Sequence, residues 1–378
     1  MATEYLMWTL VFAMMLYMLL LIVITWGWFS LKYFNSHETA PQILLSVVVA
    51  VRNEESNIGL LLKDLMNQNY SNDFYEIIIV DDHSEDSTRT IVINISEENP
   101  QCSIRLIQAK SNGKKAALAE GIDTATGELI VTTDGDCTMG AEWLTSIVGF
   151  YKEQKPALII APVVYQNERG ILQKLFSLDF VSLVASGAGS AGARLPFMGN
   201  GANLAFTKQA WQRAISGQSG DSLASGDDVF LIHRIARIFG NKSIQFLKNT
   251  SAVVRTNPPA SFRDFFQQRI RWASKAKAYK SPWAIFVPVV VLAVNFLIAL
   301  TFFAGFYKAW FFIIYGLFVV LKLLIDLPLL VEFTGFVNKR NLLILSFPFA
   351  LIYPLYIVIA AFPAMFFRFE WKGRKGLK

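Results

Sequence analysis

The stretch that decides the fold is GELIVTTDGDCTMGAEW, residues 127–143. In it, a short apolar run from Leu129 to Val131 leads through two threonines to Asp134 and Asp136, which one glycine separates. Apolar, β-branched residues bounded by glycines predict a short buried strand that ends in a turn. The two aspartates then follow the carboxyl end of a strand, which is the edge of an open α/β sheet where ligands bind. Two hard oxygen ligands at this place suit Mg²⁺ or Mn²⁺ shared with the phosphates of a substrate, although Asp-x-Asp also occurs in solvated turns.

Three earlier apolar runs have the same design. Residues 44–51, 76–80 and 104–109 each end in a polar cluster, and each is followed by a helical pattern. Strand, polar loop and helix in alternation predict an α/β fold with a mostly parallel, doubly wound sheet. One such cluster is usually a turn or a helix N-cap, but four on one sheet edge favour a nucleotide site. The residues expected along this edge are Glu54, Asp81, Asp82, Lys114, Asp134 and Asp136.

The two ends of the chain are apolar and predict a membrane protein with a polar middle. Hydrophobic residues make up 53% of the 378 residues, and the mean hydropathy is +0.39. Residues 6–31 carry no charge and are long enough to cross a bilayer, which favours a retained signal anchor. Glu4 precedes this segment and Lys32 follows it, so the positive-inside rule places the polar middle in the cytoplasm, at a bacterial inner or plasma membrane.

The domain plan follows from these shifts in composition. We expect an anchor at 1–35, an α/β domain at 42–255, an amphipathic interfacial segment at 256–282, a membrane region at 283–367 and a basic tail at 368–378. Residues 170–194 are apolar but interrupted by charge, and predict an amphipathic helix against the membrane or against a channel in the protein rather than a span.

The membrane region holds three apolar stretches, at 283–306, 309–331 and 342–367. Three crossings from a cytoplasmic domain would leave the basic tail outside, against the positive-inside rule. The last stretch contains three prolines, so it is the candidate for a re-entrant or interfacial segment. Lys322 and Asp326 lie four residues apart in the second stretch and are expected to pair or to face the protein interior.

The net charge of +6 and the two cysteines narrow the class of protein. Anionic lipid headgroups and a diphosphate explain the basic residues better than nucleic acid does, because these residues flank membrane segments. Cys102 and Cys137 have no metal-ligand spacing and fit a reduced compartment. The basic residues before the membrane region are Arg263, Arg269, Arg271, Lys275, Lys277 and Lys280.

Four runs, VVVAVRNEE, IIIVDDHSEDST, NGKKAALAEGI and VTTDGDC, in this order resemble the nucleotide-binding half of the family-2 inverting glycosyltransferases with a GT-A fold. The resemblance covers about residues 44–272. It implies that Asp82 and the loop at Ala50, Arg52 and Glu54 hold the base and ribose of the donor, and that Lys114 lies close to the nucleotide. Asp134 and Asp136 match the family's Asp-x-Asp, whose second carboxylate ligates the metal; Asp134 is expected to serve the ribose as well.

The acceptor half carries three further matches. FMGNGANLAF at 197–206 resembles the loop before the acceptor pocket, with Gly201 and Asn203 at the matching positions. SGDDVFL at 225–231 resembles Gly-Glu-Asp-x-x-Leu, with Asp227 in place of glutamate and Asp228 at the catalytic base. QRIRW matches Gln-x-x-Arg-Trp, a motif of polysaccharide-synthesising members, through Gln268, Arg271 and Trp272. The structural alternative for the paired aspartates is a helix N-cap. The alternative for Gln-x-x-Arg-Trp is an interfacial helix with a basic face.

These matches predict a membrane-bound, metal-dependent inverting glycosyltransferase. The resemblance implies transfer from a nucleotide-diphospho-sugar, expected to be a UDP-sugar, to a lipid or glycan acceptor. Three alternatives stay open: a processive polysaccharide synthase, a non-catalytic nucleotide-binding membrane scaffold and a transporter, the last disfavoured because the spans carry few ionisable residues. The sugar, the acceptor and the oligomeric state do not follow from the motifs.

Overall fold

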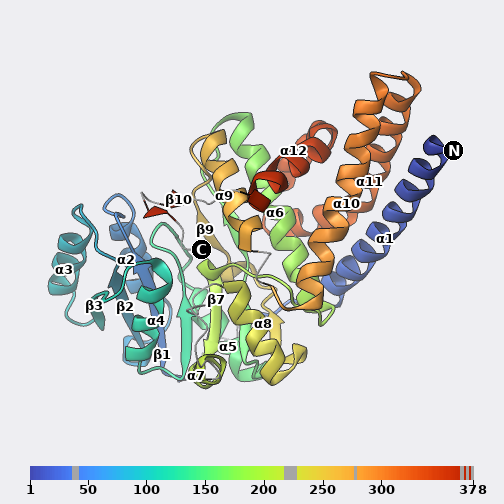
Figure 1. Cartoon of the computed structure of the whole chain (residues 1–378). Coiled ribbons are helices and arrows are strands. Elements are labelled where there is room, and N and C mark those ends of the chain that lie inside the picture. The colour runs from blue at the N-terminus through green and yellow to red at the C-terminus, as the bar shows by residue number, and fades with distance from the viewer. Residues whose placement is uncertain (36–41, 217–227, 276–278, 367–369, 372–373, 376–378) are drawn as a thin grey trace. The chain divides into compact units, whose positions relative to one another are not determined.

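The chain folds into two compact units (Figure 1). The computed structural model describes residues 1–35, 42–216, 228–275, 279–366, 370–371 and 374–375. One unit combines Gly27–Gln166 with Gly187–Asn257, and we call it the sheet unit. The other combines Met1–Trp26, Asn167–Ser186 and Pro258–Lys378, and we call it the helical unit.

A seven-stranded sheet in the order β3-β2-β1-β4-β7-β5-β8 forms the core of the sheet unit. The first four strands in this order are parallel, while β7 is antiparallel to both β4 and β5. The predicted α/β class with a mostly parallel sheet is therefore confirmed. The strands are β1 Leu45–Val51, β2 Tyr75–Asp81, β3 Ile104–Gln108, β4 Leu129–Thr132, β5 Leu158–Ile160, β7 Leu204–Thr207 and β8 Ile244–Phe246.

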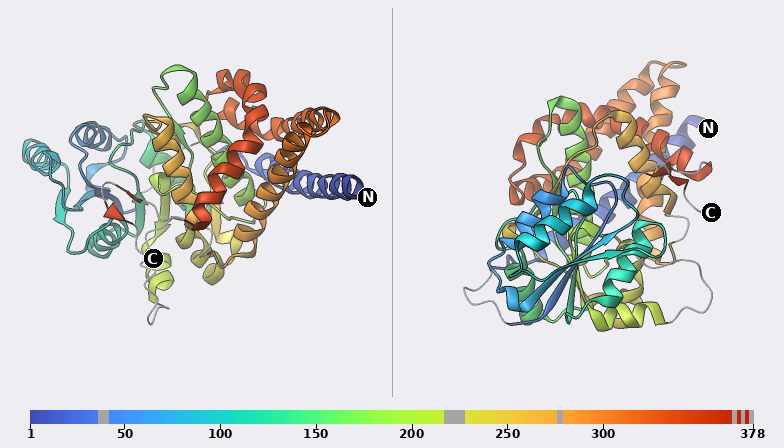
Figure 2. Two further views of the ribbon diagram at one scale, coloured as in Figure 1. Left: turned by 45° about the horizontal axis from the view of Figure 1, so that its top comes forward. Right: turned by 90° about the vertical axis from the view of Figure 1, so that its left-hand side faces the viewer.

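The apolar runs explain why the middle of this sheet is fully enclosed. Every residue of β1, β2 and β4 is buried, as expected for strands covered on both faces by helices (Figure 2). Gly121 lets one helix approach closely, since a Cβ there would lie 2.6 Å from Val48 Cγ1. The covering helices are α2 Ile58–Met66, α3 Thr88–Glu98, α4 Lys114–Thr124 and α5 Trp143–Gln154, and the first three follow β1, β2 and β3 as the helical patterns predict.

Smaller elements complete the sheet unit. A second, parallel sheet pairs β6 Val163–Tyr165 with β9 Val254–Thr256. The helices α7 Lys208–Ser216 and α8 Asp228–Phe239 follow β7 in the chain. Short 3₁₀ turns lie at η1 Asn72–Phe74, η2 Gly201–Asn203, η3 Asn241–Ser243 and η4 Thr250–Ala252.

The carboxyl-terminal end of the first helix, α1 Ala2–Ser30, is fixed within the sheet unit by a buried lysine. Lys248 lies over the rings of Trp28 and Tyr33, at 3.9 and 4.5 Å. Its ammonium group donates to the carbonyl oxygens of Trp28 and Leu31, both at 3.3 Å. A cation at a helix carboxyl terminus neutralises the partial negative charge of the last carbonyls, so the anchor end is tied to the segment after β8.

The helical unit contains the apolar ends of the chain. Among the described residues, five helices are long and apolar enough to cross a membrane, including all three predicted carboxyl-terminal stretches. The helix predicted at 170–194 is also one of these five candidates, and half of its most apolar stretch is buried inside the protein. The elements are α6 Gly170–Gly192, α9 Phe262–Lys275, α10 Pro282–Gly305, α11 Trp310–Phe336, η6 Arg340–Leu345, α12 Ser346–Phe366, and the strands β10 Glu370–Trp371 and β11 Arg374–Lys375.

Two charged groups within α11 pair with each other. Lys322 lies 2.7 Å from Asp326, which confirms the predicted pair in α11. The hydroxyl of Tyr17 donates to the same carboxylate at 2.5 Å, so α1 and α11 share this polar contact. The ring of Tyr353 in α12 lies 4.8 Å from the Lys322 ammonium group.

Candidate functional site

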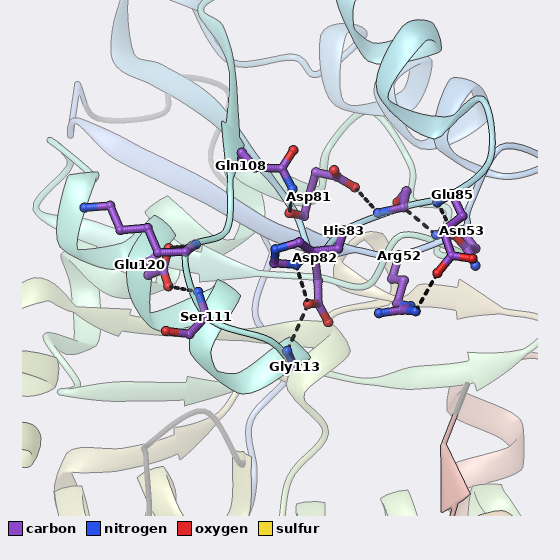
Figure 3. Close-up of polar contacts among 12 residues, drawn as sticks. Arg52, Asn53, Asp81, Asp82, His83, Glu85, Gln108, Ser111, Gly113 and Glu120 are labelled. Atoms are coloured by element: carbon purple, nitrogen blue, oxygen red, sulfur yellow. Dashed lines mark hydrogen bonds and ion pairs between the residues drawn. The ribbon is translucent and has the colours of Figure 1, made fainter. Parts of the chain in front are cut away.

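The loops after β1 and β2 interlock at the carboxyl edge of the sheet (Figure 3). Asn53 has a left-handed φ of 52°; its N–H donates to Ser84 Oγ at 3.0 Å, and its side-chain oxygen accepts the Glu85 N–H at 2.9 Å. The guanidinium of Arg52, only 10% exposed, reaches Glu85 at 3.1 Å. These contacts fix the first predicted donor loop, which starts from the buried Ala50 in β1.

Asp82 occupies the centre of this edge. It is 1% exposed, and its backbone N–H donates to the Val51 carbonyl at 2.8 Å. One carboxylate oxygen accepts the Gly113 N–H at 2.9 Å and lies 3.4 Å from His83 Nδ1 (Figure 3). Gly113 has φ 108°, a conformation that favours glycine, and leads directly into α4. The ends of β1, β2 and β3 therefore meet at this one residue, as the alternating pattern predicts.

Glu54 connects this edge to the Asp-x-Asp turn. Its carbonyl accepts the N–H groups of Asn57 and Ile58 at 2.9 Å and so begins α2, while its carboxylate accepts from the Asn57 amide at 2.9 Å. A Cβ on Gly135 would lie 3.0 Å from Glu54 Cγ and 3.1 Å from Val51 Cγ1. Glycine between the two aspartates thus lets their turn lie directly against Glu54.

The two aspartates have different surroundings. Lys114 Nζ lies 2.5 Å from Asp134, so the predicted nucleotide lysine and the first aspartate form an ion pair. Asp136 accepts a hydrogen bond from Thr256 Oγ1 at 2.9 Å. Burial and the nearby carboxylates of Asp134 and Glu54 raise the pKa of Asp136, against the opposing effects of Thr256 and Lys114. Negative charge therefore exceeds positive charge at this turn.

This chemistry fits a divalent cation shared with a ligand. Within the part of the chain that the structure describes, no three His, Cys, Asp or Glu side chains are placed to hold a metal by themselves. Asp134 and Asp136 supply oxygen ligands, and Mg²⁺ or Mn²⁺ is commonly held by one or two carboxylates together with substrate phosphates. Burial and the carboxylates of Asp134 and Glu54 raise the pKa of Asp136, so a bound cation would offset the repulsion between these acids.

The predicted catalytic base lies against the predicted acceptor loop. Gly201 precedes β7, which pairs with β4, and Thr132 Oγ1 at the end of β4 donates to the Gly201 carbonyl at 2.8 Å. The Gly201 N–H donates to Asp228 Oδ2 at 2.8 Å, and the Val229 N–H donates to Asp228 Oδ1 at 2.9 Å. Asp228 begins α8 and is thereby tied to the strand that ends in the Asp-x-Asp turn.

Asn203 holds this loop from inside the core. Its side chain is fully buried, donates to the carbonyls of Pro162 and Ala252 at 2.8 Å each, and accepts from Trp143 Nε1 at 3.0 Å. The sequence predicts Asn203 among the substrate-binding residues; in the structure its buried amide contacts protein groups. Asp227 lies outside the described residues.

The Gln-x-x-Arg-Trp match lies on α9, in the helical unit. Gln268, Arg271 and Trp272 fall in the predicted helix, but the neighbouring Arg269 differs from its prediction. The sequence grouped Arg269 with residues facing lipid headgroups; instead it is 7% exposed and pairs with Asp179 of α6. The reason is electrostatic: a charge buried between helices needs a partner, and the carboxylate of Asp179 is the partner of the Arg269 guanidinium.

Two residues that sequence reasoning missed belong to these sites. Thr256 donates to Asp136 because the backbone next to it, at Arg255, pairs with Thr138. Residues more than 100 positions apart form this pairing, so no local sequence pattern predicts it. In the sequence, Asp179 is one of the charged residues that interrupt the apolar stretch at 170–194. A charge within an apolar helix is itself a signal of a partner or a function.

Comparison with known proteins gives two family matches. Glycosyl transferase family 2 matches residues 46–185, and Glycosyl transferase family group 2 matches residues 129–365, more than half of the chain.

Among curated proteins, a beta-monoglucosyldiacylglycerol synthase from Nostoc sp. is 32% identical over 112 residues, which are 29% of this chain and 24% of that protein. A probable glycosyltransferase, YdaM, from Bacillus subtilis is 25% identical over 252 residues, 64% of this chain and 57% of that protein. The matches thus span about a quarter to just over half of these relatives' lengths.

Among solved structures, a mannosyltransferase from Pyrobaculum calidifontis in complex with GDP-Man and Mn²⁺ superposes with a TM-score of 0.58. The similarity covers 96% of this chain and 99% of that one at 19% identity, which shows a common fold.

Proposed function

Because this chain belongs to glycosyl transferase family group 2 and has the GT-A fold that the sequence predicted, we propose that it transfers a sugar from a nucleotide-diphospho-sugar to a lipid or glycan acceptor with inversion. One observation carries the proposal. The carboxyl edge of a single sheet carries Asp82, the Lys114–Asp134 pair and Asp136, and Asp228 at the start of α8 accepts a hydrogen bond from the adjoining loop at Gly201.

The donor side of the site would use the interlocked loops. Asp82 would contact the base, and the loop from Ala50 to Glu54 would hold the base and ribose. Lys114 would lie next to the diphosphate and has an ammonium group already positioned by Asp134. The proposed donor is a UDP-sugar; the structural neighbour contains GDP-Man, so both nucleotides belong in a donor screen.

Asp134 and Asp136 would hold Mg²⁺ or Mn²⁺ together with the donor phosphates. A bound divalent cation supplies positive charge beside the leaving diphosphate. The protein's own contribution is orientation: Thr256 fixes one oxygen of Asp136, and Gly135 keeps the turn against Glu54. The resemblance assigns further substrate contacts to Gln268, Arg271 and Trp272.

Asp228 would act as the general base. The acceptor oxygen attacks the anomeric carbon, the bond from that carbon to the diphosphate oxygen breaks, and the acceptor's proton passes to Asp228. The N–H groups of Gly201 and Val229 hold both carboxylate oxygens, which orients the base. The attack comes from the face opposite the diphosphate, so the anomeric centre is inverted without a covalent intermediate.

The acceptor is proposed to be a membrane lipid or a glycan, used at the cytoplasmic face. The apolar helices and the relative named as a diacylglycerol glycolipid synthase support a lipid. The Gln-x-x-Arg-Trp match favours a second candidate, a processive polysaccharide synthase. Product length separates the two, because a lipid carrying a single sugar excludes processive synthesis.

The test uses the full chain in membranes with radiolabelled UDP- and GDP-sugars, with and without Mn²⁺. We expect label to enter lipid or glycan with one donor, and Asp228→Asn to lower kcat about 1,000-fold while the nucleotide dissociation constant changes less than twofold. Wild-type turnover by the purified variant would show that Asp228 is not the base. Tight nucleotide binding without transfer from any donor would favour the non-catalytic scaffold.

A further inference from the structure

An ion pair buried inside the helical unit joins α6 to α9. Arg269 Nε donates to Asp179 Oδ2 at 2.7 Å, and Arg269 Nη2 lies 2.6 Å from the same oxygen. The two side chains are 7% and 3% exposed. Such a pair is expensive to desolvate, and replacing both partners by apolar residues is often neutral or stabilising. Stability alone therefore gives a weak reason for these two charges.

Aromatic rings enclose the guanidinium on both sides. The centre of the Arg269 guanidinium lies 4.6 Å from the ring of Phe265 and 4.4 Å from the ring of Trp272. Phe265 stacks on Phe176 of α6 at 4.0 Å, and Trp272 lies 6.1 Å from Phe180. Residues 265, 269 and 272 share one face of α9, and this face contacts α6, which lies beside it in Figure 1. Phe265 also stacks on Tyr356 of α12 at 5.7 Å.

Arg269 also contacts the first residue of the Gln-x-x-Arg-Trp match. Its Nη1 donates to Gln268 Oε1 at 3.3 Å. One side chain thus touches Gln268 and Trp272, two of the three matched residues, while the pair with Asp179 fixes its own position. Arg271 is two residues further on, about 200° around the helix, and so points away from Asp179.

We propose that Arg269, anchored by Asp179, is a positioning residue that sets the orientation of Gln268 and Trp272 for sugar transfer. The inference rests on the proposed function and adds to it a residue outside the matched motif. Arg269 acts through its neighbours: its charge is compensated by Asp179, its Nη1 donates to Gln268, and its guanidinium lies over the ring of Trp272. A misplacement of about 1 Å at a reacting group can lower a rate about 100-fold.

The test separates positioning from packing with a double substitution. Arg269→Met together with Asp179→Leu removes both charges and refills the space with apolar atoms, so that thermal stability is kept. The same change removes the hydrogen bond to Gln268 and the guanidinium face on Trp272. We expect kcat to fall about 100-fold, the nucleotide dissociation constant to stay within twofold, and the melting temperature to stay close to that of the wild type.

Two further variants complete the design. Arg269→Lys with Asp179 retained keeps the charge but loses the planar group, and is expected to recover only part of kcat. The control is a half-buried ion pair of the helical unit, Lys339 with Glu168, whose carboxylate also accepts from Ser177 at 2.7 Å. Lys339→Met together with Glu168→Gln is expected to leave kcat within twofold of wild type.

The outcomes are distinct. Wild-type kcat in the stable double variant would overturn the positioning role, because the pair would then serve packing alone. The positioning role would also be overturned if the control variant lost kcat as well, and if kcat in both double variants fell in step with the melting temperature. A wild-type protein that transfers no sugar from any donor would overturn the proposed function, and this inference with it.

Discussion

At the amino edge of the central sheet, Glu76 is surrounded by donors, whereas at the carboxyl edge Asp136 is surrounded by other acids. Glu76 accepts from Ser46 Oγ, the Thr126 N–H and Arg105 Nη2 at 2.6 Å each. Burial raises the pKa of Glu76, but these hydrogen bonds and the guanidinium outweigh it, so the net shift is downward. Burial raises the pKa of Asp136 as well, and there the neighbouring carboxylates add to the rise.

The two carboxylates differ in whether protein groups compensate their negative charge. Glu76 is buried and Asp136 is half-buried, and both lie next to strands of the central sheet. The protein completes the surroundings of Glu76, which joins β1, β2, β3 and the segment before β4. It leaves excess negative charge around Asp136, and a ligand with positive charge would complete that edge. Buried carboxylates of the first kind support the fold, and those of the second kind indicate function.

The largest expected effect is at the carboxyl edge. Asp136→Asn should lower sugar transfer at least 100-fold, because a neutral amide is a poor ligand for a hard cation. Folding stability should stay the same or rise slightly, since the substitution removes one of several repelling charges. Transfer assays and thermal unfolding of the same preparations measure both quantities.

A metal titration gives this prediction its control. Chelation of the wild type should abolish transfer, and Mn²⁺ or Mg²⁺ should restore it and raise the melting temperature in the presence of nucleotide. The variant should show a much smaller rise. Equal rises in both proteins would mean that the cation is bound elsewhere, and the comparison between the two edges would lose its basis.

A smaller effect is expected at the amino edge, and on stability. Glu76→Gln should lower the free energy of unfolding by about 2 kcal/mol at pH 7, because hydrogen bonds to a charged group are replaced by weaker ones. The folded-state pKa of Glu76 is lowered, so its contribution is complete above the unfolded pKa of about 4.3 and disappears as the pH falls through the folded value. Denaturant unfolding from pH 7 to pH 3 should show the two proteins converging.

The matching readout is activity at a temperature where both proteins are folded. Glu76→Gln should keep kcat and the donor KM within twofold of wild type. A loss of transfer without a loss of stability would place Glu76 on the functional side of the comparison.

Local sequence patterns were enough to predict the fold and the carboxyl edge. Apolar runs that end in polar clusters predicted β1 to β4, and the observed strands agree with them within a residue or two. Because carboxyl ends of parallel strands share one edge, Asp82, Lys114 and Asp134 could be placed together from the sequence. The structure brings them there, with Gly113 donating to Asp82 and Lys114 paired with Asp134.

Contacts that depend on distant segments could not be predicted in this way. Thr256 meets Asp136 only because β9 pairs with β6 and bridges to Thr138. Arg269 belongs to a run of basic residues that suggested lipid contact, and only the packing of α9 on α6 shows its pair with Asp179. Composition predicts that a charge is present, while its partner is decided by tertiary structure.

The smallest effect is expected at an exposed residue of the carboxyl edge. It tests whether burial, rather than position on this edge, separates residues that matter for nucleotide binding from those that do not. Glu85 lies on the same edge as Asp82 and pairs with Arg52 at 3.1 Å, but its side chain is 79% exposed (Figure 3). Exposed ion pairs are screened by water and salt and contribute at most about 1 kcal/mol. Glu85→Ala should therefore change the free energy of unfolding by less than about 0.5 kcal/mol, and the nucleotide dissociation constant by less than twofold.

Asp82→Ala is the matched variant, expected to weaken nucleotide binding about 10-fold because it also removes the acceptor of the Gly113 N–H. Should Glu85→Ala weaken nucleotide binding as much as Asp82→Ala, then Arg52 needs its exposed partner to hold the donor loop, and the functional part of this edge extends to the surface of the sheet unit.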